Sequence, residues 1–374
     1  MIKVLFMIPN LGHGGAEKVL VNLVNNMDKQ KFDITVMTLY DEGVHKASLA
    51  SHISYKTCFK RSVPGIAHFL KLFSPHFLYN RFIQEHYDIV VSYLEGQTAR
   101  IVSGCSDRRT KKVCWIHRTM TTLKDSARLF RNENEAIRCY TAFDKIVSVS
   151  RDVQDAFMKL YHLQNKGAVI YNTNLTDLIL EMSNEKISSE LFSESYFKIC
   201  AMGTLFPVKG FKRLLKVHKE LVWKGYKVHT YILGEGPEKK QLENLAKQYG
   251  VEKTFTLLGY QKNPYAYMKH CDLFVCSSFS EGFSTAVTEA LVLGIPVVTT
   301  RVSGMVELLG ENEYGIITNN DEIDLYNAIK SLIDCEDKYK YYCIKAKERG
   351  QFFSKEKTVK ESENFFINLI NLKI

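Results

Sequence analysis

The sequence has 374 residues, of which 45% are hydrophobic and 24% charged, and this length and balance are typical of a soluble protein with two hydrophobic cores. Its nine scattered cysteines include no C-x-x-C pair, which excludes a disulfide framework and a zinc spacing and favours reduced thiols in the cytosol. The net charge of +9 is uneven, because residues 1–180 carry 24 Lys and Arg against 16 Asp and Glu, and residues 56–131 alone carry 14 against 5. We therefore expect the first half to face something anionic, although a generic solubilising surface would carry the same charge.

Short apolar segments alternate with amphipathic helices through the first half of the chain. The N-terminal apolar run is too short for a secretory signal and predicts a first strand, which a glycine-rich turn and a helix over residues 16–26 follow. The segments expected as strands are 3–8, 34–39, 88–93, 111–116, 145–150 and 168–171. Strands that alternate with helices predict a parallel sheet covered on both faces.

A polar stretch rich in Ser and Asn, residues 173–195, interrupts this rhythm as a linker between domains would. The alternation then restarts, with strands expected at 197–202, 229–233, 255–257, 273–277 and 296–299. A C-terminal amphipathic helix is expected over 355–372, after a candidate N-cap at Ser354. We predict an α/β fold of two successive doubly wound domains, residues 1–180 and 181–354, followed by a helical segment, 355–374. No uncharged apolar stretch reaches the roughly 18 to 20 residues of a membrane-spanning helix, so we expect none.

The first candidate ligand-binding element is the loop with Gly12, Gly14 and Gly15, between the first strand and the first helix. Glycines let the backbone approach a ligand, and a helix N-terminus attracts an anion. The spacing is G-x-G-x-x-E, so the dinucleotide fingerprint fails at its third glycine, although Asp41 falls where the ribose-binding acid of an NAD site would lie. An ordinary tight turn and an oxidoreductase loop are the alternatives.

A second candidate, Lys209 with Gly210, follows the first strand of the second half. A lysine beside a glycine at a strand end can supply a positive charge to a diphosphate without blocking its close approach. An exposed turn lysine is the alternative.

The third and most informative element runs from Ser277 to Glu289. A strand ends, Glu281 occupies the turn with Gly282 and Phe283, and a helix is expected to begin near Ser284. The backbone amides at 283–285 would then point out of the carboxyl end of the sheet, where ligands bind in open α/β folds. Two carboxylates flanking an anion-binding helix end suit two hydroxyl-bearing parts of one ligand that phosphates join. Solvent-facing glutamates are the alternative.

Glu281 and Glu289 have the E-x7-E spacing of the retaining family 4 glycosyltransferases, and the chain resembles that family over nearly its whole length. Further matching segments are Gly14-Gly15-Ala16-Glu17, Gly203 to Gly210, Leu233-Gly234-Glu235-Gly236-Pro237 and Ser303-Gly304-Met305-Val306-Glu307. The resemblance implies the GT-B fold, in which two Rossmann-like domains face each other across a cleft, the acceptor is held by the first domain and the donor by the second. It also implies that the C-terminal helix crosses back to pack on the first domain.

The same resemblance implies roles for individual residues. It places Glu289 on the ribose hydroxyls and Glu281 on the donor sugar, and it makes Glu281, Lys209 and His117 the catalytic candidates. His117, which follows the strand ending at Ile116, matches a histidine that hydrogen-bonds the donor sugar, although by itself it would be a structural histidine. Lys209 and the amides of Phe283 and Ser284 would contact the diphosphate, and Gly15 would approach it from the first domain. The full set of donor-binding residues would be Gly14, Gly15, Thr204, Lys209, Gly282, Phe283, Ser284 and Glu289.

Thr204 is a departure from the family, because many members have an arginine there. Lys209 and backbone dipoles would then carry the diphosphate, unless Arg118 or Arg301 supplies the missing charge. No D-x-D motif occurs, so we expect electrostatic stabilisation of the leaving group without a metal, and no cofactor. We expect front-face transfer with retained configuration, in which the departing phosphate assists deprotonation of the acceptor hydroxyl.

On the acceptor side, residues 69–82 interleave aromatic and basic side chains within the basic region. This segment could lie on an anionic membrane surface and receive a lipid-linked saccharide, or it could be an ordinary amphipathic helix that packs inward. We expect a cytoplasmic enzyme, and the first of these alternatives would make it peripheral on the inner face of the membrane.

The resulting hypothesis is the transfer of a hexose or N-acetylhexosamine from a UDP-sugar to a lipid-linked saccharide. The segment from Gly282 to Gly315 is similar to bacterial enzymes that assemble capsule, O-antigen or exopolysaccharide. A GDP-mannose-dependent mannosyltransferase of the same fold is the alternative. A non-enzymatic anion-binding or nucleic-acid-binding protein is a remote one, and we expect no nucleic-acid partner because no recognised motif accompanies the basic charge.

Overall fold

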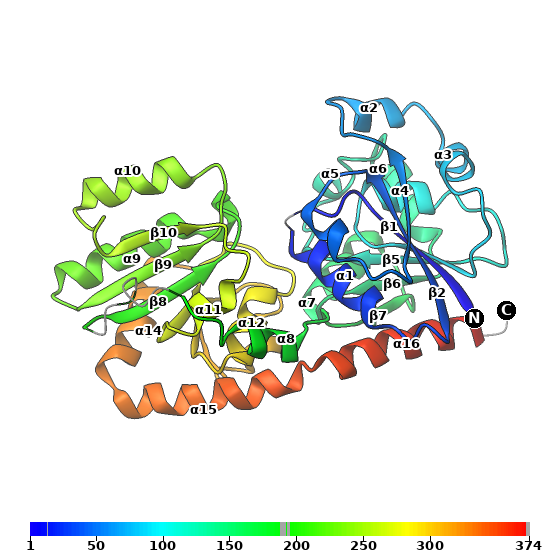
Figure 1. The fold of residues 1–374 in the computed structure, drawn as a ribbon. Coiled ribbons are helices and arrows are strands. Elements are labelled where there is room, and N and C mark those ends of the chain that lie inside the picture. The colour runs from blue at the N-terminus through cyan, green and yellow to red at the C-terminus, as the bar shows by residue number, and fades with distance from the viewer. Residues whose placement is uncertain (13, 188–191, 193–194, 372–374) are drawn as a thin grey trace. The chain divides into compact units, whose positions relative to one another are not determined.

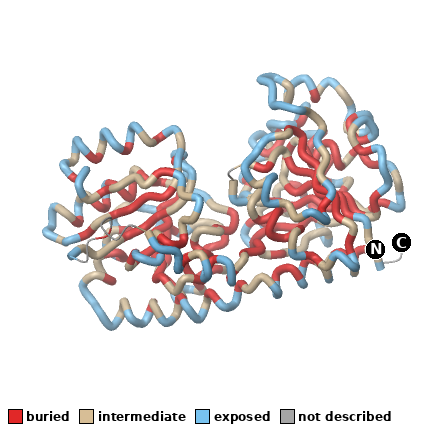
Figure 2. Tube along the Cα trace, in the orientation of Figure 1, coloured by how far each residue is buried: buried red, intermediate tan, exposed pale blue. Residues whose placement is uncertain are grey.

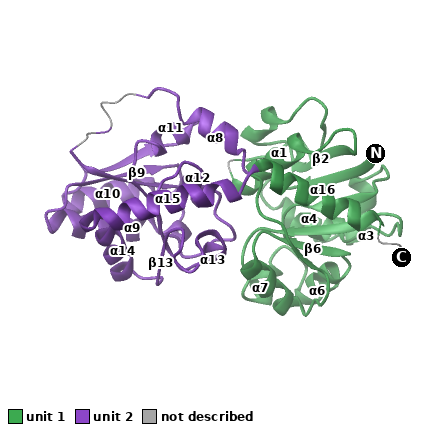
Figure 3. Cartoon of the chain, turned by 90° about the horizontal axis from the view of Figure 1, so that it is seen from below, with its two compact units in different colours: residues 1–173, 355–374 green, residues 174–354 purple. Residues whose placement is uncertain are grey.

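The structure, a computed structural model, describes residues 1–12, 14–187, 192 and 195–371. The chain divides into two compact units, unit 1 with residues 1–173 and 355–374 and unit 2 with residues 174–354 (Figure 3). Each unit is built on one parallel β-sheet with helices on its faces (Figure 1). Residue 180, where the sequence places the domain boundary, lies inside helix α8 (Thr176–Met182), which packs on helices of unit 2.

Unit 1 contains a seven-stranded sheet in the order β3-β2-β1-β4-β5-β6-β7. The strands are β1 (Ile2–Ile8), β2 (Phe32–Tyr40), β3 (Ser54–Phe59), β4 (Ile89–Ser92), β5 (Lys111–Ile116), β6 (Lys145–Ser148) and β7 (Gly167–Val169). The helices are α1 (Gly15–Asn26), α2 (Ile66–Leu70), α3 (Pro75–Phe82), α4 (Gln97–Val102), α5 (Leu123–Ser126), α6 (Glu133–Thr141), α7 (Arg151–Tyr161) and α16 (Lys355–Asn371), with a 3₁₀ turn η1 (Val44–Ser48). Residues 4–8 of β1 are all buried, as expected of a central strand that helices cover on both faces.

Unit 2 contains a six-stranded sheet in the order β10-β9-β8-β11-β12-β13. The strands are β8 (Phe197–Met202), β9 (Val228–Leu233), β10 (Phe255–Gly259), β11 (Leu273–Cys276), β12 (Val297–Thr300) and β13 (Ile316–Thr318). Besides α8, the helices are α9 (Phe211–Trp223), α10 (Lys239–Tyr249), α11 (Pro264–Met268), α12 (Thr285–Val292), α13 (Met305–Leu309), α14 (Glu322–Asp334) and α15 (Glu336–Phe352), with a 3₁₀ turn η3 (Pro207–Lys209). The core of unit 2 lies where α9 and α14 pack on the sheet, and Figure 2 shows the central strands buried.

In both sheets the first strand of the unit lies in the interior, and the chain later returns to its other side. In unit 1 this happens between β1 and β4, and in unit 2 between β8 and β11. Open α/β sheets bind ligands outside the carboxyl ends of their strands at such a reversal of strand order. The carboxyl edge of each sheet, where the strands' C-terminal ends lie, is therefore the place to look for a site.

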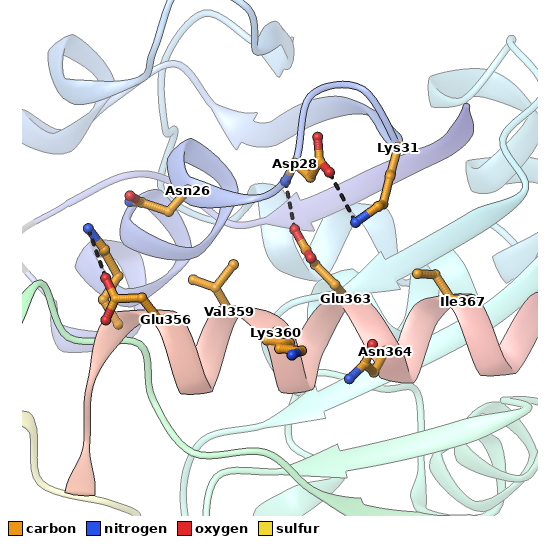
Figure 4. A pocket seen from close by; sticks show the side chains of 10 residues that line it. Asn26, Asp28, Lys31, Glu356, Val359, Lys360, Glu363, Asn364 and Ile367 are labelled. Atoms are coloured by element: carbon orange, nitrogen blue, oxygen red, sulfur yellow. Dashed lines mark hydrogen bonds and ion pairs between the residues drawn. The ribbon is translucent and has the colours of Figure 1, made fainter.

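Helix α16 returns the C-terminal segment to unit 1 (Figure 3), as the sequence predicts. The Phe366 ring is fully buried and meets the ring of Phe6 at a centroid distance of 5.8 Å. The Asp28 amide donates a 2.6 Å hydrogen bond to Glu363 Oε1, and Lys31 pairs with Asp28 at 3.1 Å (Figure 4). Aromatic packing and the Asp28–Glu363 hydrogen bond together fix α16 against unit 1.

Three features of unit 1 and unit 2 differ from the sequence predictions. Strands β3 and β13 were not expected, and each is the outermost strand of its sheet. Residues 173–195 are not a continuous linker, because α8 forms within them, while residues 188–191 and 193–194 lie outside the described part. Residues 69–82 form no single helix, since a turn separates α2 from α3.

The sequence also predicts no membrane-spanning helix. Within the described ranges, none of the helices combines the length and the hydrophobicity that crossing a bilayer requires.

Candidate functional site

The carboxyl edge of the unit 2 sheet holds a lysine–glutamate ion pair. Lys209 ends the turn that follows β8, and Glu281 lies in the loop between β11 and α12. Lys209 Nζ donates to Glu281 Oε1 at 2.7 Å and to Oε2 at 2.9 Å, and the Ser278 hydroxyl donates to Oε1 at 2.6 Å. Burial alone would lower the pKa of Lys209, but the Glu281 carboxylate outweighs it and raises that pKa above its ordinary value. The lysine is therefore a fixed positive charge.

The backbone around Gly210 holds the two loops together. Gly210 has a φ of +68°, and a Cβ on it would lie 2.0 Å from the Ser277 carbonyl oxygen, so no other residue fits without displacing the chain. The Ser277 hydroxyl donates to the Lys209 carbonyl at 3.0 Å, and the Phe279 amide donates to the Val208 carbonyl at 2.7 Å. The turn that carries Lys209 and the loop that carries Glu281 thus form one fixed structure.

The N-terminus of α12 lies next to this pair. Ser284 is the N-cap residue, and its hydroxyl accepts a hydrogen bond from the Val287 amide. Gly304, with a φ of +79°, packs so closely that a Cβ on it would lie 2.6 Å from the Gly282 carbonyl oxygen, and Phe283 is buried. The first amides of the helix therefore form an ordered, electropositive end at the carboxyl edge.

A narrow pocket joins these elements, and Lys209, Glu281 and Ser284 are among the residues that line it. The sequence predicted all three as site residues, and the structure brings them together. Gly282 and Phe283 lie in the same loop. Three of the predicted residues thus share one pocket, and their role in donor binding stays a prediction.

Glu289 is fixed by a contact that the sequence did not predict. It lies on α12 with only 2% of its surface exposed, and its Oε1 accepts a 3.0 Å hydrogen bond from the Tyr265 hydroxyl. Tyr265, on α11, is also buried. A buried carboxylate requires hydrogen-bond partners, and this tyrosine holds Glu289 in one orientation.

In unit 1, Gly14 and Gly15 lie at the start of α1. Gly14 is the N-cap residue, and because it has no side chain it caps none of the first helix amides. Gly15 begins the helix. The Glu17 carboxylate lies against this end of the helix: a Cβ built on Gly14 would be 2.1 Å from Glu17 Oε2. Burial raises the pKa of Glu17. His13, within the predicted loop, lies outside the described residues.

His117 directly follows β5, at the carboxyl edge of the unit 1 sheet. Its backbone amide donates to Glu95 Oε2 at 3.1 Å, and its ring lies 4.8 Å from that of Tyr93. Burial lowers the pKa of His117 to about 3, so the imidazole is neutral. Its Nε2 is buried and has no hydrogen-bond partner among the described residues. The side chain can therefore offer a neutral polar group to a ligand.

The departure at Thr204 has no obvious compensation from the two arginines that the sequence suggests. Thr204 itself is exposed. Arg118 pairs with Glu95 at 3.0 Å and with Asp125 at 3.2 Å. Arg301 lies 3.6 Å from Glu311. Each arginine is thus already next to a carboxylate.

Asp41, the candidate ribose-binding acid of an NAD site, is engaged otherwise. It pairs with Lys46 at 2.5 Å and accepts a 2.8 Å hydrogen bond from the Tyr55 hydroxyl. The structure therefore gives the oxidoreductase alternative no support.

A further pocket, of about 450 Å³, lies between α16 and the segment before β2. Figure 4 shows Asp28, Lys31 and Glu363 on its wall, already engaged with one another. These residues lie at the amino ends of the strands, opposite the edge where α/β sheets bind ligands. We therefore assign this pocket to the docking of α16.

Each unit matches the model of one sequence family. The family described as "Glycosyltransferase Family 4" matches residues 13–173, and the one described as "Glycosyl transferases group 1" matches residues 182–349. The chain belongs to the family 4 glycosyltransferases. This glycosyltransferase has the GT-B architecture of two Rossmann-like α/β units, as the sequence predicts.

Similar proteins match most of the length of the glycosyltransferase chain. The N-acetylgalactosamine-N,N'-diacetylbacillosaminyl-diphospho-undecaprenol 4-alpha-N-acetylgalactosaminyltransferase of Campylobacter jejuni is 26% identical over 98% of this chain and 100% of its own. The amylovoran biosynthesis glycosyltransferase AmsD of Erwinia amylovora is 21% identical over 86% and 88%. Anabaena HepE in complex with UDP-glucose aligns with a TM-score of 0.79 at 19% identity, covering 98% of this chain and 100% of HepE, which shows a common fold.

Sequence reasoning missed Tyr265, Ser278 and Glu95 as partners of the predicted residues. Ser278 stands three residues before Glu281, a spacing that lets a loop hydroxyl reach a carboxylate, so a local signal existed. Tyr265 and Glu95 reach their partners from other elements, and nothing in their own sequence context indicates those contacts.

Proposed function

We propose that this glycosyltransferase moves a hexose or N-acetylhexosamine from a UDP-sugar to a lipid-linked saccharide, with retained configuration, in cell-surface polysaccharide synthesis. The observation that carries the proposal is the Lys209–Glu281 pair beside the N-terminus of α12. A fixed cation, ordered helix amides and a carboxylate at one carboxyl edge match the diphosphate and the sugar of such a donor. The lipid-linked acceptor is suggested by the substrate named for the Campylobacter jejuni relative.

In unit 2 the donor would be held by three kinds of group. Lys209 and the amides of Phe283 and Ser284 would face the negative charge of the diphosphate, and Thr204 would contact the donor without adding charge. Glu281 accepts hydrogen bonds from the sugar hydroxyls. Glu289, oriented by Tyr265, accepts them from the ribose. Lys209 is paired with Glu281 before the donor binds, and in the complex it would be shared between Glu281 and the diphosphate.

For unit 1, the family resemblance supports roles for Gly14, Gly15 and His117. The glycines allow backbone to approach the diphosphate. His117 would donate or accept a hydrogen bond to the sugar as a neutral imidazole, in keeping with its pKa of about 3 and its unpartnered Nε2.

The chemistry we propose is front-face substitution. The bond between the anomeric carbon and the diphosphate oxygen breaks as the acceptor hydroxyl approaches from the same side, and that hydroxyl gives its proton to the departing phosphate. Lys209 and the N-terminus of α12 stabilise the negative charge on the leaving group. No enzyme nucleophile, cofactor or metal is required by this route.

The donor base is supported as uracil by the UDP complexes of HepE, although that likeness is one of fold. A panel of UDP, GDP, UDP-hexoses, UDP-N-acetylhexosamines and GDP-mannose in a thermal-shift assay tests this proposal, since a ligand stabilises the state that binds it. We expect UDP and one UDP-sugar to raise the melting temperature, Lys209→Met to abolish the shift, and the exposed control Lys240→Met to keep it. Stabilisation by GDP-mannose and GDP alone would establish the mannosyltransferase alternative instead.

We further propose that the reaction takes place at the cytoplasmic face of the membrane. All nine cysteines are free thiols, which is typical of a reducing compartment.

A further inference from the structure

Unit 1 presents a compact group of exposed apolar side chains between β3 and β4. Val63, Phe69, Leu72 and Phe77 lie on or beside α2 and α3 and are between 50% and 72% exposed. Helix α2 projects from the rest of unit 1 (Figure 1). A cluster of large apolar side chains in water is unfavourable and marks a surface that another phase or molecule covers. We call residues 63–77 the apolar turn.

The guanidinium groups of two arginines bind backbone carbonyl groups of the apolar turn. Arg100 donates to the carbonyl oxygens of Leu70 at 3.1 Å and Phe73 at 2.6 Å. Arg131 donates to the Leu72 carbonyl at 2.7 Å and also to that of Lys71. The carbonyl groups at the end of α2, which a short helix does not fully pair, thus accept hydrogen bonds from guanidinium groups.

One buried ion pair supports this arrangement. Arg100 and Glu135 are both almost fully buried, and Arg100 Nε and Nη2 each lie 2.9 Å from the Glu135 carboxylate. The Arg131 amide donates to the same carboxylate at 2.7 Å. Because this network is fixed, the exposure of Leu72 is a built feature of the surface and not the result of a frayed loop.

The aromatic side chains of the apolar turn are also ordered. The ring centroids of Phe69 and Phe73 are 5.3 Å apart, and those of Phe73 and Phe77 are 5.1 Å apart in a stacked arrangement. The inner face of α3 packs inward through Leu78 and Tyr79. Ordered rings lose little conformational freedom when they enter another phase.

The charged side chains around the apolar turn are mostly basic. No Asp or Glu occurs between Glu42 and Glu85 in the sequence. The cations near the turn in sequence or contact include Lys60, Arg61, Lys71, Arg128 and Arg131, and Lys71 Nζ donates to the Arg128 carbonyl at 2.7 Å. Two carboxylates lie close to the turn. That of Glu42 accepts a hydrogen bond from the Ser62 amide at 2.7 Å, and that of Glu135 is buried and paired with Arg100.

We propose that the apolar turn enters the interfacial region of an anionic phospholipid bilayer, with Lys60, Arg61, Lys71 and Arg128 facing the lipid phosphates. Apolar tips within a rim of cations are the chemistry that such an interface selects. Four side chains on a small projection provide far less than the roughly 800 Å² per partner of a stable protein interface. A bilayer is therefore favoured over a second copy of the chain.

The apolar turn adjoins the carboxyl edge of the unit 1 sheet. Leu129 is partly exposed, and its side chain would lie 2.8 Å from a Cβ on Gly96, which follows β4. The loop over residues 60–65 follows β3 at the same edge. Membrane binding by the apolar turn would bring the acceptor side of the enzyme to the bilayer. This role, but not the binding itself, rests on the proposed lipid-linked acceptor.

Vesicle co-sedimentation of the full chain tests the proposal without any nucleotide sugar. Vesicles of phosphatidylcholine alone are compared with vesicles of phosphatidylcholine and phosphatidylglycerol at about 7:3, since anionic lipid attracts basic surfaces. We expect binding to the mixed vesicles, at least about tenfold weaker binding for the double variant Leu72→Ser/Phe77→Ser, and weaker, less salt-sensitive binding for Lys60→Glu/Arg61→Glu. The matched control Ile323→Ser, at the same 72% exposure in unit 2, should bind as the wild type does.

Equal partitioning into both vesicle types, or wild-type binding by the Leu72→Ser/Phe77→Ser variant, would overturn the proposal. Concentration-dependent dimerisation that this variant abolishes would assign the surface to a second copy of the chain instead. UDP-induced thermal stabilisation, measured on the same variants, should stay unchanged. Failure of vesicle binding with UDP stabilisation intact would therefore count against the membrane surface and not against the proposed function.

Discussion

Lys209 Nζ lies 2.7 Å from one carboxylate oxygen of Glu281 and 2.9 Å from the other. The pair links the segment after β8 to the loop before α12, and Gly210 makes the approach of these two backbones possible. Without a nucleotide, the cation proposed for the diphosphate is neutralised by the carboxylate proposed for the sugar. Donor binding must therefore redistribute an interaction that already exists within the site.

A double-mutant cycle on this pair measures the interaction. Lys209→Met and Glu281→Gln each leave a partly buried group without its partner, so each should lower the free energy of unfolding, while the double variant should recover part of the loss. We expect a coupling of about 1–3 kcal/mol from urea unfolding of the four proteins. Additive effects within about 0.5 kcal/mol would show that the two side chains do not stabilise each other.

Tyr265→Phe removes the hydroxyl that orients Glu289. The ring stays in place, but the buried carboxylate loses a hydrogen-bond donor, so the proposed ribose contact should weaken. We expect the dissociation constant of UDP in titration calorimetry to rise by roughly 3- to 10-fold and KM for the donor to rise with it, while kcat changes little. Unchanged UDP affinity in Tyr265→Phe would show that Glu289 does not contact the ribose. Tyr267→Phe, on the same helix, is the matched control.

The ionisation of His117 can be followed by NMR of its imidazole nitrogens. Histidine has an ordinary pKa of 6.5, and burial lowers that of folded His117 to about 3. The unfolded chain thus binds this proton more tightly. The stability contributed by neutral His117 is complete above pH 6.5 and declines as the pH falls from 6.5 toward 3.

We accordingly expect no titration of His117 between pH 5 and 8 and no acidic limb of kcat from this residue in that range, because its pKa lies near 3. A titration midpoint near 6.5 would mean that His117 is open to solvent and charged in the folded enzyme.

Activity in excess EDTA tests the proposed stabilisation of the leaving group. If Lys209 and the N-terminus of α12 carry the diphosphate charge, the initial rate should be the same with and without chelator. Complete loss that manganese or magnesium restores would refute a metal-independent reaction.

Several elements could be predicted from the sequence because their hydrophobic pattern is local. β5 and β8 have the predicted bounds, and α12 begins directly after Ser284. β3 escaped because none of its residues is fully buried and its sequence, SYKTCF, mixes polar and apolar side chains. An outer strand is defined by pairing with its neighbour, which a local pattern does not reveal.

In the candidate site, too, the residues of local motifs could be predicted and the contacts between distant elements could not. Glu281, Gly282, Phe283 and Ser284 are contiguous, so one motif predicts them together. Lys209 was a separate candidate, because it stands beside a glycine after a strand. The contact of Tyr265 with Glu289 depends on the packing of α11 near α12, and the partners of Arg118 depend on where α5 lies. Such contacts follow from tertiary structure, which spacing along the chain does not encode.

The most direct test of the central claim is acceptor-dependent release of UDP by the purified protein. The assay combines UDP-sugars with an undecaprenyl-diphosphate-linked saccharide and compares wild type with Glu281→Ala. We predict release that requires both substrates and falls at least about 100-fold in the variant, as when a group acting on the transition state is removed, with UDP binding retained. No acceptor-dependent release from any UDP-sugar, or a wild-type rate from Glu281→Ala, would contradict the account.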